Sequence, residues 1–211
     1  MPKNNHELLA EVADYYSAKI AQHGETALGV DWNGEESQTL RFQQLCKLIK
    51  TSDCFSINDL GCGYGALYDF LANRYDGFNY TGIDVSDGMV RAARQRYKNA
   101  LQARFFVSSE PEQVADYCIA SGVFNVRLGR SDEEWRAYLE ATLDVMDRTS
   151  RHGFAFNCLT SYSDEDKKRD YLFYADPCQV FDLCMRRYSR HVALRHDYGL
   201  YEFTMYIRKI V

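Results

Sequence analysis

The sequence predicts an α/β fold with a mostly parallel sheet, and two observations support that prediction. An apolar-rich run ends at Leu60, three glycines follow at every second position, and a helical pattern begins at Ala66. A strand, a glycine turn and a helix in this order open nucleotide-binding α/β folds. The last two strand patterns are joined only by residues 197–199, which is short enough for an antiparallel hairpin. The chain is therefore expected to form a parallel sheet closed by an antiparallel C-terminal hairpin strand.

Apolar periodicity and capping residues place the individual elements. Asn4 and Glu7 fit a helix start, Gly24 fits its end, and a second helix is expected over 35–50. Seven strands are expected over 56–60, 79–84, 103–107, 117–120, 153–159, 192–196 and 200–210. The helices between them are expected over 66–75, 87–98, 131–148 and 176–190. This order predicts a three-layer α-β-α sandwich over 51–211, with residues 1–50 as a helical lid.

Composition limits the class of protein. The chain has 211 residues, of which 46% are hydrophobic and 26% charged, so one sizeable core is expected. It contains no run of eighteen apolar residues and begins with a polar segment, which predicts a cytoplasmic protein without a membrane anchor. The net charge of −5 argues against a partner that is a nucleic acid. The oligomeric state remains open.

The cysteines do not suggest a metal site. There are seven, an odd number, and no two are spaced as C-x-x-C. Most fall within expected strands or helices, where a cysteine behaves as a small hydrophobe. We expect reduced thiols and no bound metal.

Two acids flank the glycine turn. Asp59 lies two residues before Gly61, and Asp84 ends the second expected strand. A dinucleotide fingerprint reads G-x-G-x-x-G, whereas here the glycines are spaced G-x-G-x-G. A carboxylate beside the turn would repel a pyrophosphate but suits a cation. Asp84 is placed to accept hydrogen bonds from ribose hydroxyls.

Residues 59–65 and 82–86 closely resemble the first two motifs of the class I S-adenosylmethionine-dependent methyltransferases. The resemblance implies a Rossmann-like fold, S-adenosylmethionine as cofactor, S-adenosylhomocysteine as product and no metal. It places the cofactor-binding residues in the first two strand–turn–helix units, in the loops after strands three and four, and on the helix before strand one. They are Arg41, Asp59, Gly61, Cys62, Gly63, Gly65, Asp84, Val85, Ser86, Met89, Ser109, Glu110 and Ser121.

Arg41 is assigned to the carboxylate at the methionine end of this cofactor, because a buried carboxylate needs a cation nearby. A guanidinium can bind a carboxylate through two hydrogen bonds, which a lysine cannot do. The alternative is a surface arginine on an amphipathic helix. Arg41→Ala is expected to weaken cofactor binding by about 1.5–3 kcal/mol and to leave thermal stability nearly unchanged.

The segment after the fourth strand, 121–125, lacks the Asn/Asp-Pro-Pro-aromatic signature of enzymes that methylate nucleic-acid amines. The interpretation that remains is a small-molecule acceptor methylated at O or N. Its binding site is expected to be lined by aromatic and amide side chains from the lid and the later loops. They are Tyr15, Tyr16, Trp32, Phe124, Asn125, Tyr171, Tyr174 and Tyr198.

His196 and Asp197 follow the sixth expected strand at the carboxyl edge of the sheet, where ligands of open α/β sheets bind. This pair could act as a general base, or His196 could be an ordinary hairpin residue. Two other functions stay open on the sequence. One is an accessory protein that binds S-adenosylmethionine without catalysis, and the other is an NAD-dependent oxidoreductase.

Overall fold

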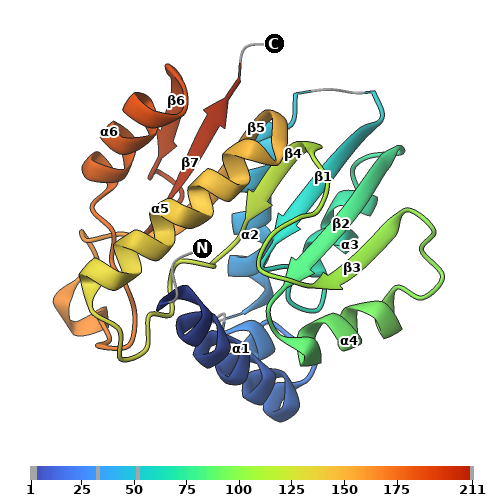
Figure 1. Cartoon of the computed structure of the whole chain (residues 1–211), viewed down its shortest axis with the longest axis horizontal. Helices are drawn as coiled ribbons and strands as arrows, with labels where there is room; N and C mark the ends of the chain where they lie inside the picture. The colour runs from blue at the N-terminus through green and yellow to red at the C-terminus, as the bar shows by residue number, and fades with distance from the viewer. Residues whose placement is uncertain (1–3, 32–33, 51–52, 210–211) are drawn as a thin grey trace.

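A seven-stranded sheet runs through the computed structural model, which describes residues 4–31, 34–50 and 53–209. The strand order is β3-β2-β1-β4-β5-β7-β6 (Figure 1). Among these strands, β7 runs antiparallel to its neighbours β5 and β6, and the other pairs are parallel. The strands are β1 (Phe55–Leu60), β2 (Phe78–Asp84), β3 (Ala103–Val107), β4 (Ala115–Ala120), β5 (Ser150–Leu159), β6 (His191–Arg195) and β7 (Glu202–Arg208).

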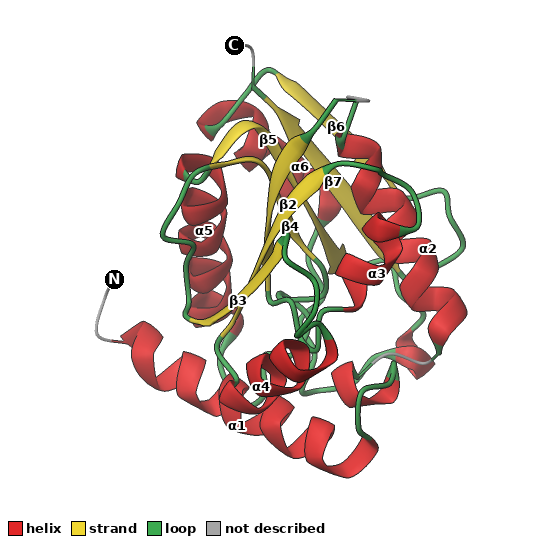
Figure 2. Ribbon diagram, turned by 90° about the vertical axis from the view of Figure 1, so that its right-hand side faces the viewer, coloured by secondary structure: helices red, strands yellow, loops and turns green. Residues whose placement is uncertain are grey.

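Helices cover both faces of the sheet (Figure 2). The helices are α1 (Asn4–His23), α2 (Glu35–Leu45), α3 (Ala66–Ala72), α4 (Asp87–Arg96), α5 (Asp132–Arg148) and α6 (Pro177–Arg187). α2, α3 and α4 pack on one face, and α5 and α6 pack on the other. α1 lies across the edge at which the parallel strands end (Figures 1 and 2).

Helices cover both faces of the central strands, so β1 and β4 are buried along almost their whole length. Along β5, Phe154 and Phe156 pack in the core under α5 and α6 together with Trp135, whereas Ala155 belongs to the core under α2 and α3. The side chains of a strand alternate between the two faces, which explains this division. The sheet therefore separates two hydrophobic cores.

The predicted fold class is confirmed, and most boundaries lie within about three residues of those expected. The described residues also form short 3₁₀ helices that were not expected: η1 (Leu28–Val30), η2 (Cys46–Leu48) and η3 (Glu165–Lys167). The second expected helix, over 35–50, ends as α2 at Leu45 and continues as η2. The last turn of a helix often tightens in this way.

The segment assigned to a lid, 1–50, has two different roles in the described residues. α1 lies over the strand ends, but α2 contacts β5 and β7, and Leu45 is fully buried in the core beneath it. α2 is therefore part of the outer layer of the sandwich. Of these two helices, only α1 lies over the strand ends, where a lid is expected (Figures 1 and 2).

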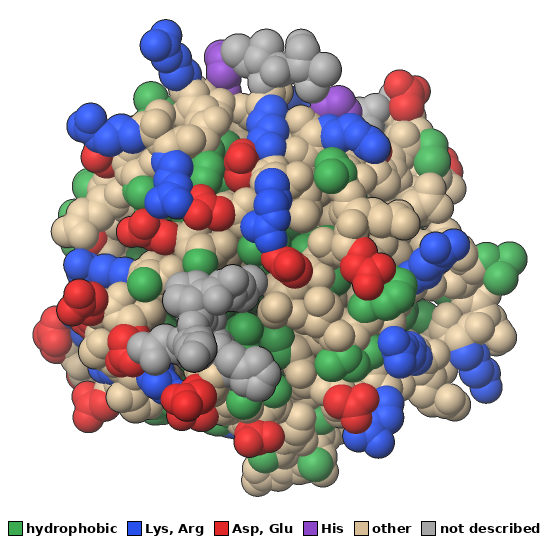
Figure 3. Space-filling view, in the orientation of Figure 1, with side chains coloured by type: hydrophobic (Ala, Val, Ile, Leu, Met, Phe, Trp, Pro, Cys, Tyr) green, Lys and Arg blue, Asp and Glu red, His purple; other side chains and the backbone are tan. Residues whose placement is uncertain are grey.

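Acidic and basic side chains alternate over the face that carries α5 and α6 (Figure 3). Arg187 of α6, for example, forms ion pairs with Glu140 and Asp144 of α5. No helix of the described residues has the length and apolarity needed to cross a membrane.

Candidate cofactor and acceptor site

The glycine turn between β1 and α3 adopts a backbone that favours glycine. Gly61, Gly63 and Gly65 have φ angles of 74°, 55° and 86°, in the left-handed region. The amides of Gly61 and Cys62 both donate to the carbonyl of Ile83, at 2.7 and 3.0 Å. These bonds hold the turn against the end of β2.

Asp84 fixes the same turn from the side. Its Oδ2 accepts a hydrogen bond from the Gly63 amide at 2.9 Å, and its Oδ1 accepts one from the Ser86 amide at 2.8 Å. Burial raises the pKa of Asp84, and the hydrogen bonds from these amides oppose that rise. The carboxylate thus stands between the turn and the start of α4.

Asp59 is a second buried carboxyl group at the end of β1. The Tyr80 hydroxyl donates to its Oδ2 at 2.5 Å. Burial raises the pKa of Asp59 to about 7; the Tyr80 hydrogen bond opposes the rise and the nearby Asp84 adds to it. Asp59 can therefore change its charge near neutral pH.

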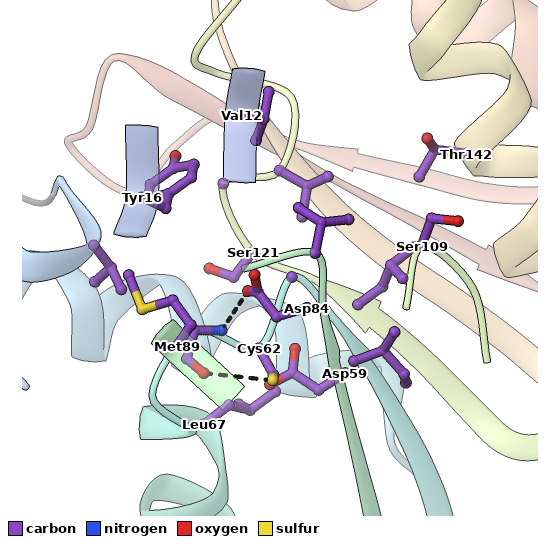
Figure 4. A pocket seen from close by; sticks show the side chains of 18 of the residues that line it. Val12, Tyr16, Asp59, Cys62, Leu67, Asp84, Met89, Ser109, Ser121 and Thr142 are labelled. Carbon is purple, nitrogen blue, oxygen red and sulfur yellow. Dashed lines mark hydrogen bonds between the residues drawn. The ribbon is translucent and has the colours of Figure 1, made fainter. Parts of the chain in front are cut away.

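A pocket opens beside the two acids (Figure 4). It contains about 1050 Å³ of empty space, counted together with the solvent at its mouth. Val12 and Tyr16 of α1 face Asp84 and Ser121 from the other side of this space (Figure 4). Its described walls come from the helices α1, η1, α2, α3, α4 and α5, the glycine turn, the ends of β1 and β2, and the loops after β2, β3 and β4.

Nine of the residues predicted to bind the cofactor line this pocket. They are Asp59, Gly61, Cys62, Gly63, Asp84, Val85, Met89, Ser109 and Ser121. Ser121 also has a buried hydroxyl oxygen that finds no hydrogen-bond partner among the described residues. A polar atom in this state fits a site that a polar ligand completes.

The other predicted cofactor residues do not line the pocket. Gly65 is the N-cap of α3, and a Cβ there would lie 2.6 Å from the Tyr97 ring. Ser86 caps α4 by accepting from the Met89 amide, and Glu110 pairs with Arg148 at the surface. These three residues support the fold around the pocket rather than its wall.

Arg41 lies in a buried ion pair and not at the surface. Its Nε donates to Oε2 of Glu202 at 2.9 Å, and the side chain is 8% exposed. Arg41 is not one of the described lining residues, although Gln38 and Phe42 on the same helix are. Removing Arg41 is therefore expected to destabilise the fold, contrary to the expectation from the sequence.

Phe124 and Asn125 support the structure and are not among the described residues that line the pocket. Phe124 is fully buried, and its carbonyl accepts from the Trp135 indole at 2.7 Å. The Asn125 side chain accepts from the Leu159 amide at 3.2 Å. The residues of this loop that reach the pocket are instead the three preceding ones, Ser121, Gly122 and Val123.

Of the tyrosines predicted to line the acceptor site, only Tyr16 is among the described residues that line the pocket. Tyr15 donates to Asp31 at 2.8 Å, and the Tyr198 hydroxyl is hydrogen-bonded to that of Thr204. The Tyr174 hydroxyl accepts from the Arg169 amide, and Tyr171 is partly exposed. Trp32 lies outside the described residues.

His196 and Asp197 do not form a general base at the pocket. Asp197 is exposed and paired with Arg195 at 2.8 Å, which lowers its pKa. The His196 ring stacks on Phe203, with 6.4 Å between ring centroids. Neither residue lines the pocket. The prediction used the rule that ligands of open α/β sheets bind where the parallel strands end. β6 does end on that side, but it is the last strand of the order β3-β2-β1-β4-β5-β7-β6 and lies far along the sheet from β1.

Several wall residues were not predicted from the sequence. They are Leu9, Val12, Val30, Gln38, Phe42, Leu60, Tyr64, Ala66, Leu67, Ile83, Ser108, Gly122, Val123, Tyr138, Ala141 and Thr142. Gly122 follows a buried strand, as Gly61 does, and this sequence pattern could have indicated it. In the structure its φ is 76°, in the same left-handed region as the first glycine turn. The apolar residues of α1 and α5 gave no such signal, because each also belongs to an ordinary amphipathic pattern.

The part of the chain that the structure describes contains no cluster of His, Cys, Asp or Glu able to hold a metal ion. The pocket instead fits the predicted organic cofactor. A Cβ on Gly63 would lie 3.0 Å from Cγ1 of Val30, so the turn leaves room for a ligand only with glycine in place. Asp84 then offers acceptor oxygens beside this space.

Comparison with known proteins agrees with this geometry. The family described as a methyltransferase domain matches residues 57–148. The chain is 59% identical over 163 residues to Rv1506c of Mycobacterium tuberculosis (strain ATCC 25618 / H37Rv), a protein whose name assigns it provisionally to the methyltransferases. That match covers 77% of this chain and 98% of the relative.

Solved methyltransferase structures share the fold. Magnesium protoporphyrin IX methyltransferase from Synechocystis PCC 6803, solved with bound S-adenosylmethionine, superposes with a TM-score of 0.66 at 14% identity, over 95% of this chain and 96% of the other. The N-methyltransferase NodS from Bradyrhizobium japonicum WM9, in complex with S-adenosylhomocysteine, gives 0.65 at 17% identity, over 93% and 97%. The chain belongs to the class I S-adenosylmethionine-dependent methyltransferases, and S-adenosylmethionine is its cofactor.

Proposed function

We propose that this enzyme transfers the methyl group to an oxygen or nitrogen atom of a small molecule held between α1 and the loop after β4. The observation that carries the proposal is that Tyr16 and Ser121 line the same pocket from two different elements, with Asp84 nearby (Figure 4). The wall around them is largely apolar, with Leu9, Val12 and Val123. Pockets of this kind, apolar with a few polar groups, are typical of small-molecule sites.

The transfer requires mainly that the acceptor be positioned. The methyl group of a sulfonium is already activated, so aligning the acceptor atom can supply much of the rate enhancement. An amine must be neutral to react, and a carboxylate needs no base. Catalysis therefore does not require His196 and Asp197, which do not line the pocket.

Release of S-adenosylhomocysteine, measured against a panel of amines, phenols, alcohols and carboxylic acids, tests this function. Tyr16→Ala and Ser121→Ala should lower turnover of the best acceptor by at least about tenfold, because each removes one side of its site. Asp197→Ala is the control and should leave turnover unchanged. Methylation of RNA, DNA or protein in parallel assays, with no small molecule turned over, would contradict the proposal.

We also infer that the protein works in the cytoplasm without a nucleic-acid partner. All seven cysteines are free, and five of them are buried, as in proteins that keep their thiols reduced. The alternation of charges over α5 and α6 in Figure 3 offers no broad basic face there for a phosphate backbone.

The cofactor is expected to bind through three charged groups. Asp84 is proposed to accept from its ribose hydroxyls and Asp59 to face its ammonium group. Arg41 is proposed to bind the carboxylate of the cofactor, which requires its guanidinium to donate to Glu202 and to the cofactor at the same time.

Cofactor affinity is expected to rise with pH through neutrality. The pKa of Asp59 is about 7, so the carboxylate that attracts a cation is mostly protonated below this pH and ionised above it. Between about pH 6 and pH 8 the ionised fraction rises about tenfold, and the dissociation constant of S-adenosylhomocysteine should fall by a similar factor. Isothermal titration at several pH values measures this change. Asp59→Asn should flatten the profile, and a flat profile in the parent protein would contradict the role of Asp59.

α1 is expected to become more rigid when the cofactor binds. Leu9, Val12 and Tyr16 line the pocket, and the Ser17 hydroxyl is hydrogen-bonded to that of Ser86 at 2.8 Å. Amide hydrogen exchange over residues 7–23 should slow at least about fivefold with saturating S-adenosylhomocysteine, while exchange in α6 stays constant. Equal exchange of α1 in both states would show that it is ordinary scaffold.

A further inference from the structure

One group of buried polar residues is not explained by the pocket itself. Asn157 on β5 and Glu202 and Thr204 on β7 point toward α2, on the face opposite Phe156 and Phe203. All three are at most 1% exposed. Asn157 and Thr204 are directly paired across the two strands. Buried polar groups are costly unless they are bonded, so their bonds have to be followed individually.

These bonds form a continuous path from α2 to the pocket wall. Arg41 Nε donates to Glu202 Oε2 at 2.9 Å, and Asn157 Nδ2 donates to the same oxygen at 3.1 Å. Asn157 Oδ1 accepts from the Gly122 amide at 2.8 Å. The path crosses from α2 through β7 and β5 to the loop after β4. We call it the Arg41–Gly122 relay.

The chemistry of each member fixes the orientation of the next. An arginine only donates, so the Glu202 oxygen that it meets must be an acceptor. Burial raises the pKa of Glu202, and the Arg41 charge and the hydrogen bonds from Arg41 and Asn157 oppose that rise. The Gly122 amide can only donate, so Asn157 must present its carbonyl oxygen to Gly122 and turn its NH₂ group toward Glu202.

The end of the relay holds a tightly packed part of the pocket wall. β4 ends at Ala120, so the Gly122 amide lies beyond the strand ladder, and its φ is 76°. Ser121, Gly122 and Val123 all line the pocket. A Cβ on Gly61 would lie 2.4 Å from Cγ2 of Val123, which shows how closely this loop packs on the glycine turn. A small shift of the loop 121–123 would therefore change the part of the pocket wall that the loop forms and the part that the glycine turn forms.

We infer that Asn157 and Glu202 are positioning residues, which hold the loop 121–123 in the conformation that binds the cofactor. Neither residue lines the pocket, and both act through the Gly122 amide. The inference concerns cofactor binding, so it stands or falls independently of which acceptor is methylated.

Asn157→Leu tests the relay, with Thr204→Val as the matched control. Both changes remove buried polar atoms from paired positions of β5 and β7, but the Thr204 side chain is hydrogen-bonded to the Tyr198 hydroxyl and not to the loop. Asn157→Leu should raise the dissociation constant of S-adenosylhomocysteine at least about tenfold and speed exchange of the Gly122 amide by a similar factor. Thr204→Val should change either quantity by less than about twofold, even where both variants lose thermal stability. Equal effects of the two variants on binding would overturn the inference.

Glu202→Gln separates the acceptor role of Glu202 from its charge. Arg41 would still require an oxygen at its Nε, so the introduced amide would present its carbonyl oxygen to Asn157 as well. This variant should lose thermal stability and keep its affinity for S-adenosylhomocysteine within about threefold. A loss of affinity of about tenfold would contradict the orientation argument. In the parent protein, a Gly122 amide that exchanges as fast as exposed loop amides would overturn the relay without any variant.

Discussion

Gly63→Val should abolish measurable binding of S-adenosylhomocysteine, a loss of at least about a hundredfold. The Cβ at this position points to the pocket side of the turn, 3.0 Å from Val30 and 3.9 Å from the Met89 sulfur. The two methyl groups of a valine would extend further into the same space. Because Gly63 also donates its amide to Asp84, displacement of the turn would disturb the acid as well. Isothermal titration measures the loss.

Gly199→Val is the control for backbone strain in this experiment. Gly199 has a φ of 74°, and a Cβ there meets no atom within 4 Å. It lies in the connection between β6 and β7, away from the pocket. Both variants place a β-branched residue in the left-handed region, which costs about 1–2 kcal/mol. The control should therefore lose stability to a similar extent and still bind. If the dissociation constant of S-adenosylhomocysteine for Gly63→Val lay within about tenfold of the parent value, the glycine turn would not be part of the binding site.

The fold was predictable because its signals are local. Strand and helix boundaries follow from periodicity and caps, as in the capping box of Ser131 and Glu134 that begins α5. The turn at Gly61 and the acid before it were predictable for the same reason, because a few adjacent residues specify the geometry. These signals were sufficient to predict nine of the residues that line the pocket.

The remaining predicted residues depend on contacts between distant segments, and here prediction from sequence was weaker. Glu202 lies 161 positions from Arg41, and a single glutamate in a strand pattern gives no indication of its partner. Phe124 and Asn125 follow the right strand, but the chain turns at Gly122, so they point into the core instead of the pocket. His196 follows a strand at the correct edge, yet the position of β6 at the end of the sheet removes it from the site.

Replacing Arg41 should lower the free energy of unfolding by about 3 kcal/mol at pH 7, because it leaves Glu202 as an uncompensated buried charge. Arg41→Met keeps most of the stem volume and removes the charge. Glu202 can then bind a proton and so avoid carrying a buried, unpaired charge. From its usual pKa of 4.5, protonation costs about 3.4 kcal/mol at pH 7, and this cost sets the upper limit of the lost stability. Urea unfolding measures the change in the free energy of unfolding.

The pH dependence identifies the cause of this loss. Without Arg41 the pKa of Glu202 in the folded protein lies further above its unfolded value, so the folded state binds more protons over the interval between the two. The stability of Arg41→Met relative to the parent should therefore fall as pH rises through that interval, by up to about 1.4 kcal/mol per pH unit. The double variant Arg41→Met/Glu202→Gln removes both charges of the pair and should recover to within about 1 kcal/mol of the parent. A loss that is equal at about pH 5.5 and pH 7.5, and unchanged in the double variant, would show that Arg41 stabilises the fold by packing alone.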